Sequence, residues 1–472
     1  MSVIIVHFLS KKKDRIYDTI VITAVAGVNI IHKKSLRIVH NLYGIGIIRM
    51  EFRCTIHFFT GRIKMEKQVS ILLVGIGGYG EVYVRSLLNH AADGRFIIKG
   101  VVDPKPEACS RYAEIINGGV PVFASLDDFH RNAEAELTVI SSPIQYHCPQ
   151  TCTALRKYSN VLCEKPMCAT IEDAMKMMKA RDESGKFLAI GYQWSFSKAV
   201  QALKQDVIKG ILGRPKRLKT IVLWPRDDIY YKRGWAGKKR DSNGNWILDS
   251  VANNATAHYL HNMFYILGEK MDASARPEYA EAELYRANNI ENFDTSVVRT
   301  VTGDNTEIMF YASHAVDSLY GPAFRYEFEN AVATFESTGD NPQITAVFKD
   351  GKTKSYGNPS TEIEGAKLWT CIDAVLENTA IPCGPEAAFS HTLCINAMQE
   401  SVPDIATFSD SIIRIKENPS SSSKVKYVDG LGDALLKCYD SWLLPGEAGY
   451  PWSRAGKKVY IDDLLSAAKR NI

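Results

Sequence analysis

The sequence predicts an α/β fold: a doubly wound parallel sheet, followed by a second domain of α+β type with an antiparallel sheet. Three observations favour this fold. An apolar strand runs directly into a glycine-rich turn at residues 70–80. Strand and helix patterns alternate from there to about residue 190, as they do in parallel sheets. From about residue 217 the chain has longer β-type stretches separated by turn residues, which is typical of antiparallel sheets.

The glycine-rich turn is the stretch around which the first domain is organised. Four apolar residues, 71–74, predict a strand buried on both faces. Gly75, Gly77 and Gly80 follow in G-x-G-x-x-G spacing, and a helix is expected over 81–89. The first glycine permits a tight turn, the second lets a pyrophosphate approach the backbone, and the third lets the helix pack close to the strand. The helix N-terminus offers unpaired N–H groups to the phosphates.

A second apolar run, Phe96 to Val102, ends at Asp103, 23 residues after Gly80. In dinucleotide-binding folds an acidic side chain at this place binds the adenosine ribose hydroxyls. A purely structural turn is the alternative, and the acid after the second strand argues against it. Because Asp103 would repel a 2′-phosphate, we expect NAD as the cofactor and NADP less; Lys105 moderates that preference.

The remaining elements of the first domain follow from the same alternation of patterns. We expect strands over 137–140, 161–163 and 187–190, and helices over 106–117, from near His147, and over 171–184, where Gly185 ends the helix.

The second domain has its own strand and turn signals. Strands over 295–302 and 307–314 flank a Gly-Asp-Asn turn, and the stretches 344–348 and 353–356 predict a hairpin. Asn418, Pro419 and the serines at 420–423 predict a surface loop. The residues expected to pack back on the body are Trp442, Trp452 and a helical tail over 462–469.

Length and charge set limits on the function. A chain of 472 residues is long enough for two or three domains. Residues 1–64 contain eleven Lys and Arg against three acidic residues, a net charge of +8, so the remainder carries −4 of the total of +4. The mildly acidic body argues against a nucleic-acid partner. The longest apolar run of the basic segment, residues 20–31, is too short to span a bilayer, so no membrane partner is expected.

The basic segment fits poorly with the rest of the chain. We expect residues 1–64 to be an extension that is disordered or follows from a start assigned too far upstream, with Met65 as the natural beginning; a transit peptide is the alternative. The ten cysteines are scattered without a CxxC pair, and Cys148 and Cys152 lack the further ligands that zinc requires. We therefore expect no metal site and a reducing, cytoplasmic location.

A candidate catalytic lysine follows the predicted strand over 161–163. The sequence Glu164-Lys165-Pro166 lies at the carboxyl end of that strand, the edge at which open α/β sheets bind ligands. A lysine at this place can donate to a substrate hydroxyl and stabilise the oxygen as its proton leaves. In isolation, a surface lysine in a turn explains the same residues.

The order of the motifs resembles the glucose–fructose oxidoreductase, inositol dehydrogenase and rhizopine-catabolism family (Gfo/Idh/MocA). The resemblance covers roughly residues 65–415. The motifs that carry it are Gly75-Ile76-Gly77-Gly78-Tyr79-Gly80, Val101-Val102-Asp103-Pro104, Ser142-Pro143 with His147, Glu164-Lys165-Pro166, Gly191-Tyr192-Gln193 and Gly210-Ile211-Leu212-Gly213.

This resemblance implies the organisation of the chain. It implies a Rossmann NAD-binding domain over 65–190 and a substrate and oligomerisation domain over 191–416, which contains a large, open, mostly antiparallel sheet. The extension over 417–472 follows. A homo-oligomer, dimer or tetramer, is therefore expected, as is a cis bond before Pro166.

The resemblance also implies the cofactor site and the catalytic role of Lys165. The residues expected to bind the cofactor are Gly75, Ile76, Gly77, Gly78, Tyr79, Gly80, Asp103, Pro104, Ser141, Ser142, Pro143, His147, Glu164, Lys165 and Gln193.

The second catalytic motif of the family, Asp-x-Gly-x-His, is altered in this chain. In this register its histidine is His258, with Asn254 at the aspartate position and Thr256 at the glycine position. An asparagine can orient an imidazole but cannot supply a charge to it. Asp249 could supply that charge from a neighbouring loop. His261 lies three residues after His258 on the same helix face, but without a third ligand the pair does not predict a metal site.

The segment from Trp224 to Arg240 combines aromatic and cationic residues. Aromatic faces stack on sugar rings and cations bind carboxylates, so the segment could form a wall of the substrate pocket and favour a charged sugar such as a uronate. An exposed loop with ordinary aromatic anchors is the alternative. The residues expected to bind substrate are Tyr192, Trp194, Trp235 and His261.

These observations predict an NAD-dependent oxidoreductase that transfers a hydride between the nicotinamide and a ring hydroxyl of a sugar, glycoside or cyclic polyol. Lys165 would hold the substrate oxygen, His258 would accept its proton and Asn254 would orient the site. Two alternatives stay open: an enzyme that retains NAD during glycoside cleavage or internal sugar oxidoreduction, and a non-catalytic regulator that senses a sugar or NAD.

Overall fold

The computed structural model describes residues 2–5, 21–24, 67–340, 342–361, 365–417 and 422–470. It divides the chain into two units, Met1–Ile63 and Lys64–Ile472, and each is described by itself. In the first unit, β1 (Ser2–Ile5) pairs antiparallel with β2 (Val21–Ala24). The rest of the predicted N-terminal extension lies outside the described residues, as do 418–421 of the predicted surface loop.

The second unit begins with a six-stranded parallel sheet of order β5-β4-β3-β6-β7-β8. Its strands are β3 (Val69–Val74), β4 (Phe96–Val102), β5 (Val122–Phe123), β6 (Leu137–Ile140), β7 (Asn160–Cys163) and β8 (Leu188–Ile190). The apolar side chains of β3 are buried on both faces, as the sequence predicts. The strand order reverses between β3 and β6, and open α/β sheets bind ligands in the crevice at such a point.

The helices of this part begin and end where the sequence offers caps and stops. They are α1 (Gly80–Asn89), α2 (Tyr112–Asn117), α3 (Leu126–Asn132), α4 (Ile144–Arg156) and α5 (Ile171–Ser184). Thr170 caps α5 by accepting from the Asp173 N–H, and Gly185 ends it at a φ of +65°. The predicted helix over 106–117 is wrong in its first half, because a 3₁₀ turn (Pro106–Ala108) precedes α2. No described helix is long and apolar enough to cross a membrane.

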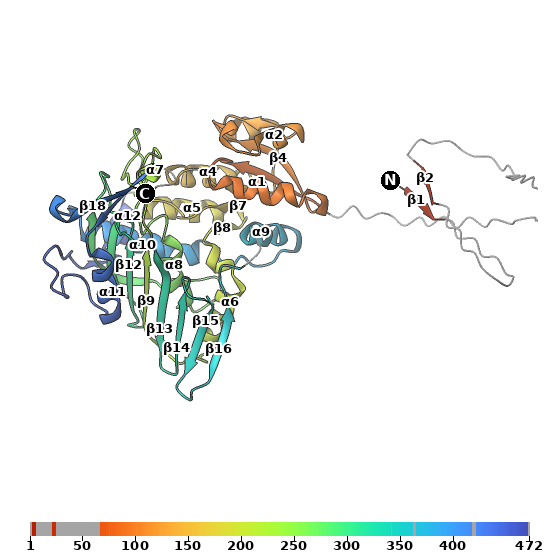
Figure 1. The fold of residues 1–472 in the computed structure, drawn as a ribbon. Coiled ribbons are helices and arrows are strands. Elements are labelled where there is room, and N and C mark those ends of the chain that lie inside the picture. The colour runs from red at the N-terminus through yellow and green to blue at the C-terminus, as the bar shows by residue number, and fades with distance from the viewer. Residues whose placement is uncertain are drawn as a thin grey trace, which may run out of the picture. The chain divides into compact units, whose positions relative to one another are not determined.

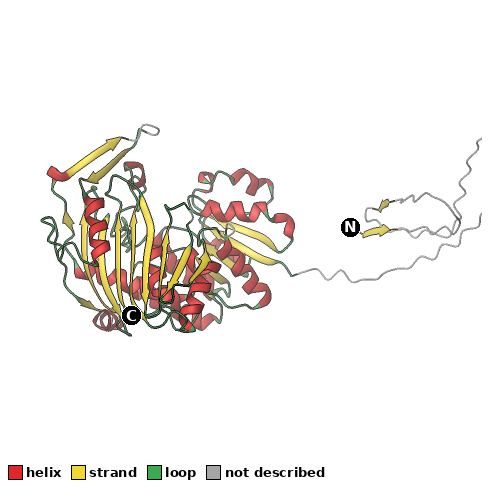
Figure 2. Ribbon diagram, turned by 60° about the horizontal axis from the view of Figure 1, so that its bottom comes forward, coloured by secondary structure: helices red, strands yellow, loops and turns green. Residues whose placement is uncertain are grey.

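A ten-stranded, mostly antiparallel sheet follows, and with it the predicted fold class is confirmed. Figure 2 shows its strands side by side. The order along the sheet is β16-β15-β14-β13-β9-β12-β11-β10-β17, and β20 pairs with β10. Among the described strands of this ten-stranded sheet, only β9 with β12 and β10 with β17 are parallel neighbours. The bounds are β9 (Pro215–Leu223), β10 (Pro277–Arg286), β11 (Thr295–Thr302), β12 (Glu307–Ser313), β13 (Tyr320–Phe328), β14 (Ala331–Glu336), β15 (Ile344–Phe348), β16 (Thr353–Gly357), β17 (Ala406–Thr407) and β20 (Val459–Tyr460).

Helices cover both faces of this large sheet. One face shares a core with the parallel sheet and with helices α6 (Lys198–Ile208), α8 (Ala257–Ile266), α9 (Ala366–Glu377) and α10 (Pro385–Ser401), all of which are labelled in Figure 1. Every residue of α8 is buried, so this helix is held from all sides.

The other face of the large sheet is covered by the C-terminal segment. There Ile221, Met309 and Tyr311 pack against Leu435 and Cys438 of α11 (Leu431–Ser441). The last helix, α12 (Ile461–Arg470), follows β20, and the two-stranded ribbon of β18 (Ile413–Glu417) and β19 (Lys424–Val428) stands apart from the sheet. The C-terminal segment therefore covers the central strands of the large sheet on this face.

The glycine turn predicts a specific sensitivity to substitution. A Cβ on Gly80 would lie 2.2 Å from the Gly75 carbonyl oxygen and 2.9 Å from Ser141 Oγ. We expect Gly80→Ala to lower the free energy of unfolding by at least about 1–3 kcal/mol, because the backbone of the turn has to move. The matched control is Gly77→Ala, whose Cβ would meet only Ala108 Cβ at 3.8 Å. Urea unfolding measures both, and equal midpoints for the two variants would contradict the packing argument.

Candidate functional site

A pocket of about 880 Å³ lies at the carboxyl ends of β3, β6 and β7. The residues that line this pocket come from the parts of the chain that contain the two sheets. The first part of the chain contributes Gly77, Gly78, Tyr79, Val82, Ser141, Ser142, Pro143, Ile144, His147, Glu164 and Lys165, and the second part contributes Arg226, Tyr230, Arg233, Trp235, Asn254 and Ala255. The parallel and antiparallel parts of the chain thus meet over one cavity.

The glycine turn forms one end of this pocket. Gly75, at a φ of +79°, packs its Cα against the backbone of Ser141, and Ser141 Oγ donates to the Gly75 carbonyl at 2.8 Å. Asp103 Oδ2 accepts from the Ile76 N–H at 2.8 Å, so the acid at the end of β4 is tied to the turn. A Cβ on Gly77 would meet only Ala108 Cβ, at 3.8 Å, and one on Gly78 would meet nothing within 4 Å. The turn therefore leaves room for a phosphate group to reach its backbone.

Lys165 lies at the other end, directly after β7, and contacts the second domain. Its Nζ donates to both the backbone oxygen and Oδ1 of Asn254, each at 2.8 Å. The bond between Lys165 and Pro166 is cis, as the family resemblance implies. Asn254 Nδ2 in turn donates to Asp249 Oδ1 at 2.8 Å, and the Gly237 N–H donates to the other oxygen of Asp249 at 2.6 Å. An ammonium, an amide and a carboxylate are joined in one row.

Burial changes the acidity of both ends of this row. It lowers the pKa of the Lys165 ammonium to about 8, an effect that the Glu164 carboxylate opposes and the Lys367 ammonium increases. Burial also raises the pKa of the Asp249 carboxyl to about 6, against the hydrogen bonds that Asp249 accepts. Both groups consequently change their charge close to neutral pH.

Glu164 binds a lysine that no motif in the sequence indicates. Lys367 Nζ donates to Glu164 Oε1 and, at 3.1 Å, to the Gly191 carbonyl, while the Tyr83 hydroxyl donates to the same carboxylate oxygen. Burial alone would lower the pKa of Lys367, but the Glu164 carboxylate raises it above the usual value. The signal that could have found Lys367 is its position on the buried face of α9, one turn before Cys371.

His258 is buried in α8, one turn after Asn254, and does not line the pocket. Burial lowers the pKa of His258 well below the usual value, and the charge of Lys165 adds to this effect, so its ring is neutral near pH 7. Within the described residues, its Nδ1 is buried without a hydrogen-bond partner. The ring stands edge-on to Tyr192, with centroids 6.0 Å apart.

Tyr192 and His261 form a buried cluster rather than a wall of the pocket. The two rings stack at 3.9 Å, the Tyr192 hydroxyl bonds His391 Nδ1 at 2.9 Å, and His261 Nε2 bonds Ser195 Oγ at 2.8 Å. Their predicted contact with substrate is not available in this arrangement, because neighbouring side chains occupy both rings. Burial lowers the pKa of His261 well below the usual value as well.

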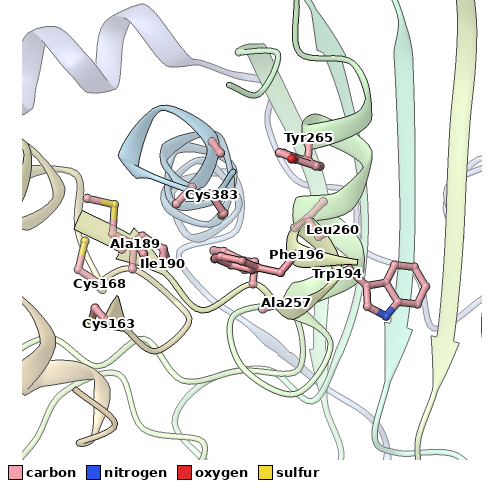
Figure 3. Close-up of a cluster of buried hydrophobic side chains, with 14 of the residues drawn as sticks. Cys163, Cys168, Ala189, Ile190, Trp194, Phe196, Ala257, Leu260, Tyr265 and Cys383 are labelled. Atoms are coloured by element: carbon pink, nitrogen blue, oxygen red, sulfur yellow. The ribbon is translucent and has the colours of Figure 1, made fainter. Parts of the chain in front are cut away.

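The predicted substrate contact of Trp194 is also corrected. Its side chain is only 1% exposed and packs edge-on against Tyr259 and Phe335. Figure 3 shows the indole turned toward the strands of the large sheet, on the far side of α8 from Cys163 and Cys168. The tryptophan lies within a 3₁₀ turn (Gln193–Phe196) that directs it into the core, which the motif around it does not reveal.

Eleven of the predicted site residues line the pocket, and ten do not. The lining members are Gly77, Gly78, Tyr79, Ser141, Ser142, Pro143, His147, Glu164, Lys165, Trp235 and Asn254. The others are Gly75, Ile76 and Gly80 within the turn, Asp103 and Pro104 beside it, the exposed Gln193, and the buried Tyr192, Trp194, His258 and His261. The segment from Trp224 to Arg240, which the sequence suggests as a wall of the substrate pocket, supplies Arg226, Tyr230, Arg233 and Trp235 to the lining; only Trp235 of these is among the predicted site residues.

His147 joins two of the loops around the pocket. Its Nδ1 lies 2.8 Å from the Pro166 carbonyl and its Nε2 lies 2.8 Å from the Ser142 carbonyl. Both neighbours only accept hydrogen bonds, so a neutral ring donates to one of them at a time. The histidine thereby fixes the loop after β6 against the loop that carries Lys165.

Comparison with known proteins agrees with this geometry. Residues 69–192 match the Gfo/Idh/MocA family, described as an oxidoreductase family with an NAD-binding Rossmann fold. This match identifies residues 69–192 as a Rossmann domain of the Gfo/Idh/MocA type. It is distantly related to an inositol 2-dehydrogenase of Rubrobacter xylanophilus, with 27% identity over 207 residues, 44% of this chain and 54% of that protein.

Further relatives and solved structures support the same family. A 1-carboxy-3-chloro-3,4-dihydroxycyclohexa-1,5-diene dehydrogenase of Comamonas testosteroni is 24% identical over 255 residues, 52% of this chain and 60% of that protein. The matches thus span about half the length of these curated relatives. The WlbA dehydrogenase of Bordetella pertussis, solved with NADH and UDP-GlcNAcA, superposes with a TM-score of 0.59 at 20% identity over 72% of this chain and 97% of that chain. That likeness establishes the fold.

The buried Lys367–Glu164 pair leads to a stability prediction. Lys367→Met leaves the Glu164 carboxylate buried without its cation, so we expect the free energy of unfolding to fall by about 3–5 kcal/mol. The double variant Lys367→Met with Glu164→Gln should recover most of this loss. The control is Lys352→Met, which breaks an exposed pair with Asp350 and should change stability by less than about 1 kcal/mol. Equal thermal midpoints for Lys367→Met and Lys352→Met would contradict the assignment.

Proposed function

We propose that this chain is an NAD-dependent dehydrogenase that oxidises a ring hydroxyl of a sugar, glycoside or cyclic polyol, or reduces the corresponding ketone. The contact between Lys165 and Asn254 carries the proposal, because it brings a cation from the Rossmann part against the second domain inside the pocket. Relatives named inositol 2-dehydrogenase and 1,5-anhydro-D-fructose reductase support a ring alcohol as the substrate class.

The residues around the glycine turn fit a dinucleotide. The uncrowded backbone of Gly77 and Gly78, just before α1, would receive the pyrophosphate at the positive end of the helix dipole. Asp103, held against the turn by the Ile76 N–H, would accept from the ribose hydroxyls and would repel a 2′-phosphate, which favours NAD over NADP. When bound, NAD supplies the carbon that takes the hydride from the alcohol.

The second domain and Lys165 would handle the alcohol itself. Lys165 now donates to Asn254 Oδ1, and the same ammonium can donate to a substrate hydroxyl that enters the pocket. A positive charge at this oxygen stabilises it as its proton leaves. His258, neutral near pH 7, is the proposed acceptor of that proton; it lies in α8, one turn after Asn254, the residue that Lys165 contacts.

Asp249 has a positioning role in this proposal. It lies beyond Asn254 in the row that begins at Lys165, so it supplies the negative charge that an asparagine lacks. The homo-oligomer expected from the family stays part of the proposal, but it would need a surface other than the central strands that α11 covers.

The first functional test replaces the candidate catalytic lysine. We expect Lys165→Met to lower kcat for NADH formation by about 100-fold or more, because the alcohol oxygen loses the cation that stabilises its developing negative charge. The control, Lys216→Met, removes an exposed lysine of β9 and should leave kcat unchanged. Stopped-flow NADH absorbance over a panel of sugars and polyols measures this.

Unchanged turnover in Lys165→Met would contradict the proposed role. NAD that stays with the protein through gel filtration, without net NADH release, would favour the cofactor-retaining alternative. Tight sugar binding with no turnover on any substrate would favour the regulator.

The pKa shifts predict the pH dependence. Asp249 takes up a proton as the pH falls through about 6, and Lys165 loses its charge as the pH rises through about 8. We therefore expect kcat/KM for alcohol oxidation to be highest between about pH 6 and pH 8 and to fall on both sides. Asp249→Asn should lose the acidic limb of this profile, whereas a loss of activity that is equal at all pH values would indicate a merely structural role.

A further inference from the structure

The segment between β9 and α8 brings two arginines into the pocket without a carboxylate for either. Arg226 and Arg233 both line the pocket. Within the described residues, neither guanidinium takes part in a salt bridge or hydrogen bond, and Arg226 Nε is buried without a partner. Arg226 is half-buried, whereas Arg233 is exposed.

Aromatic rings hold the two guanidinium groups in place. Arg226 lies 5.2 Å and Arg233 5.0 Å from the centroid of the Tyr230 ring. Arg233 also lies 5.8 Å from the ring of Trp235, which lines the same pocket. Such contacts position a guanidinium but leave its N–H groups free for an anion.

The helix that carries Tyr230 is itself fixed from behind. This helix, α7 (Asp228–Tyr231), is capped by Asp227, whose side chain accepts from the Tyr230 N–H at 3.0 Å. Asp228 accepts from the backbone N–H of Lys424 at the start of β19, at 2.8 Å. The C-terminal ribbon thus supports the segment that presents the arginines.

The charges around the pocket do not balance. Its cations are Lys165, Arg226 and Arg233, and the one carboxylate of its described lining, Glu164, is already bound by Lys367. A buried guanidinium nitrogen without an acceptor is unfavourable unless an anion enters. One further carboxylate, Asp249, acts on Lys165 and Arg233 from behind Asn254. The three cations of the lining therefore favour an anion in the pocket.

The arginines share the pocket with the candidate catalytic lysine. Arg226 and Arg233 line it together with Lys165 and Asn254. The pyrophosphate has the glycine turn before α1 for its own binding. The anion that these arginines bind accordingly belongs to the substrate.

We propose that Arg226 and Arg233 form an anion subsite that binds a carboxylate of the substrate, so that the substrate is a sugar acid or a glycoside of one. The inference rests on the proposed function. A carboxylate fits because the Nε and Nη donors of arginine form a planar fork that matches its two oxygens.

Paired substrates test the subsite directly. In steady-state kinetics with NAD, glucuronate and galacturonate should have kcat/KM values at least about 10-fold above those of glucose and galactose, because hydrogen bonds to a charged group favour the acid. Arg226→Gln and Arg233→Gln should each raise KM for the acids about 10- to 100-fold and leave the neutral sugars unchanged. The control, Arg240→Gln, removes an exposed arginine of the same segment that stacks on Trp246, outside the pocket lining.

Three results would overturn the inference. Equal kcat/KM values for acids and neutral sugars would exclude a subsite for a substrate carboxylate. A preference for glucose 6-phosphate over glucuronate would assign the subsite to a phosphate. A weaker Kd for NADH in Arg226→Gln or Arg233→Gln, without a change in sugar KM, would assign the arginines to the cofactor.

A binding measurement separates this inference from the proposed function. Calorimetric titration of glucuronate into Lys165→Met saturated with NADH requires no turnover. If adding Arg226→Gln to the Lys165→Met variant abolishes glucuronate binding, the result supports the subsite, whether or not any substrate is oxidised. If neither arginine variant changes the turnover of neutral polyols and glucuronate does not bind, the proposed dehydrogenase function still holds. The same result contradicts the anion subsite.

Discussion

The site depends on keeping a lysine charged at the junction of two domains. Burial works against the Lys165 ammonium, and three neighbours counter it: Asn254 accepts from it twice, Asp249 lies behind Asn254, and Glu164 precedes it in the chain. Glu164 in turn accepts hydrogen bonds from Lys367 and Tyr83 in the core. The Lys165 ammonium is thus surrounded by the cis bond before Pro166, the buried Lys367–Glu164 ion pair and the loop that carries Asp249.

Much of the fold could be predicted because it depends on local patterns. The strand before Gly75, the strand over 295–302 and the helix over 171–184 have the bounds or nearly the bounds that periodicity and caps predict. The helix beginning near His147 starts earlier, at Ile144, since Pro143 is favourable just before a helix and the histidine belongs to the second turn. Elements without a strong pattern, such as α3 and the ribbon of β18 and β19, gave no such signal.

The site could be predicted only where a motif and its chemistry coincide. Gly77, Lys165 and Asn254 meet at the pocket because they follow strands or precede a helix that converge there. Trp194 and Tyr192 were expected beside them on the basis of sequence proximity, yet a turn directs both into the core. The roles of Lys367 and the arginine pair arise from contacts over more than sixty residues of chain, which no local pattern encodes.

The C-terminal segment changes both the surface and the pocket of this chain. Its helix α11 closes the central strands of the large sheet on one face, and its ribbon supports α7 beside the pocket. The same segment therefore limits which surface another copy could use and helps to fix the side chains that face the substrate.

The most direct test of the account is a crystal structure with NAD and a bound sugar acid. The account predicts that one ring hydroxyl lies within about 2.7–3.2 Å of Lys165 Nζ, with its carbon facing the nicotinamide. A sugar bound elsewhere, or a nicotinamide outside the cavity that contains Lys165 and Asn254, would contradict it.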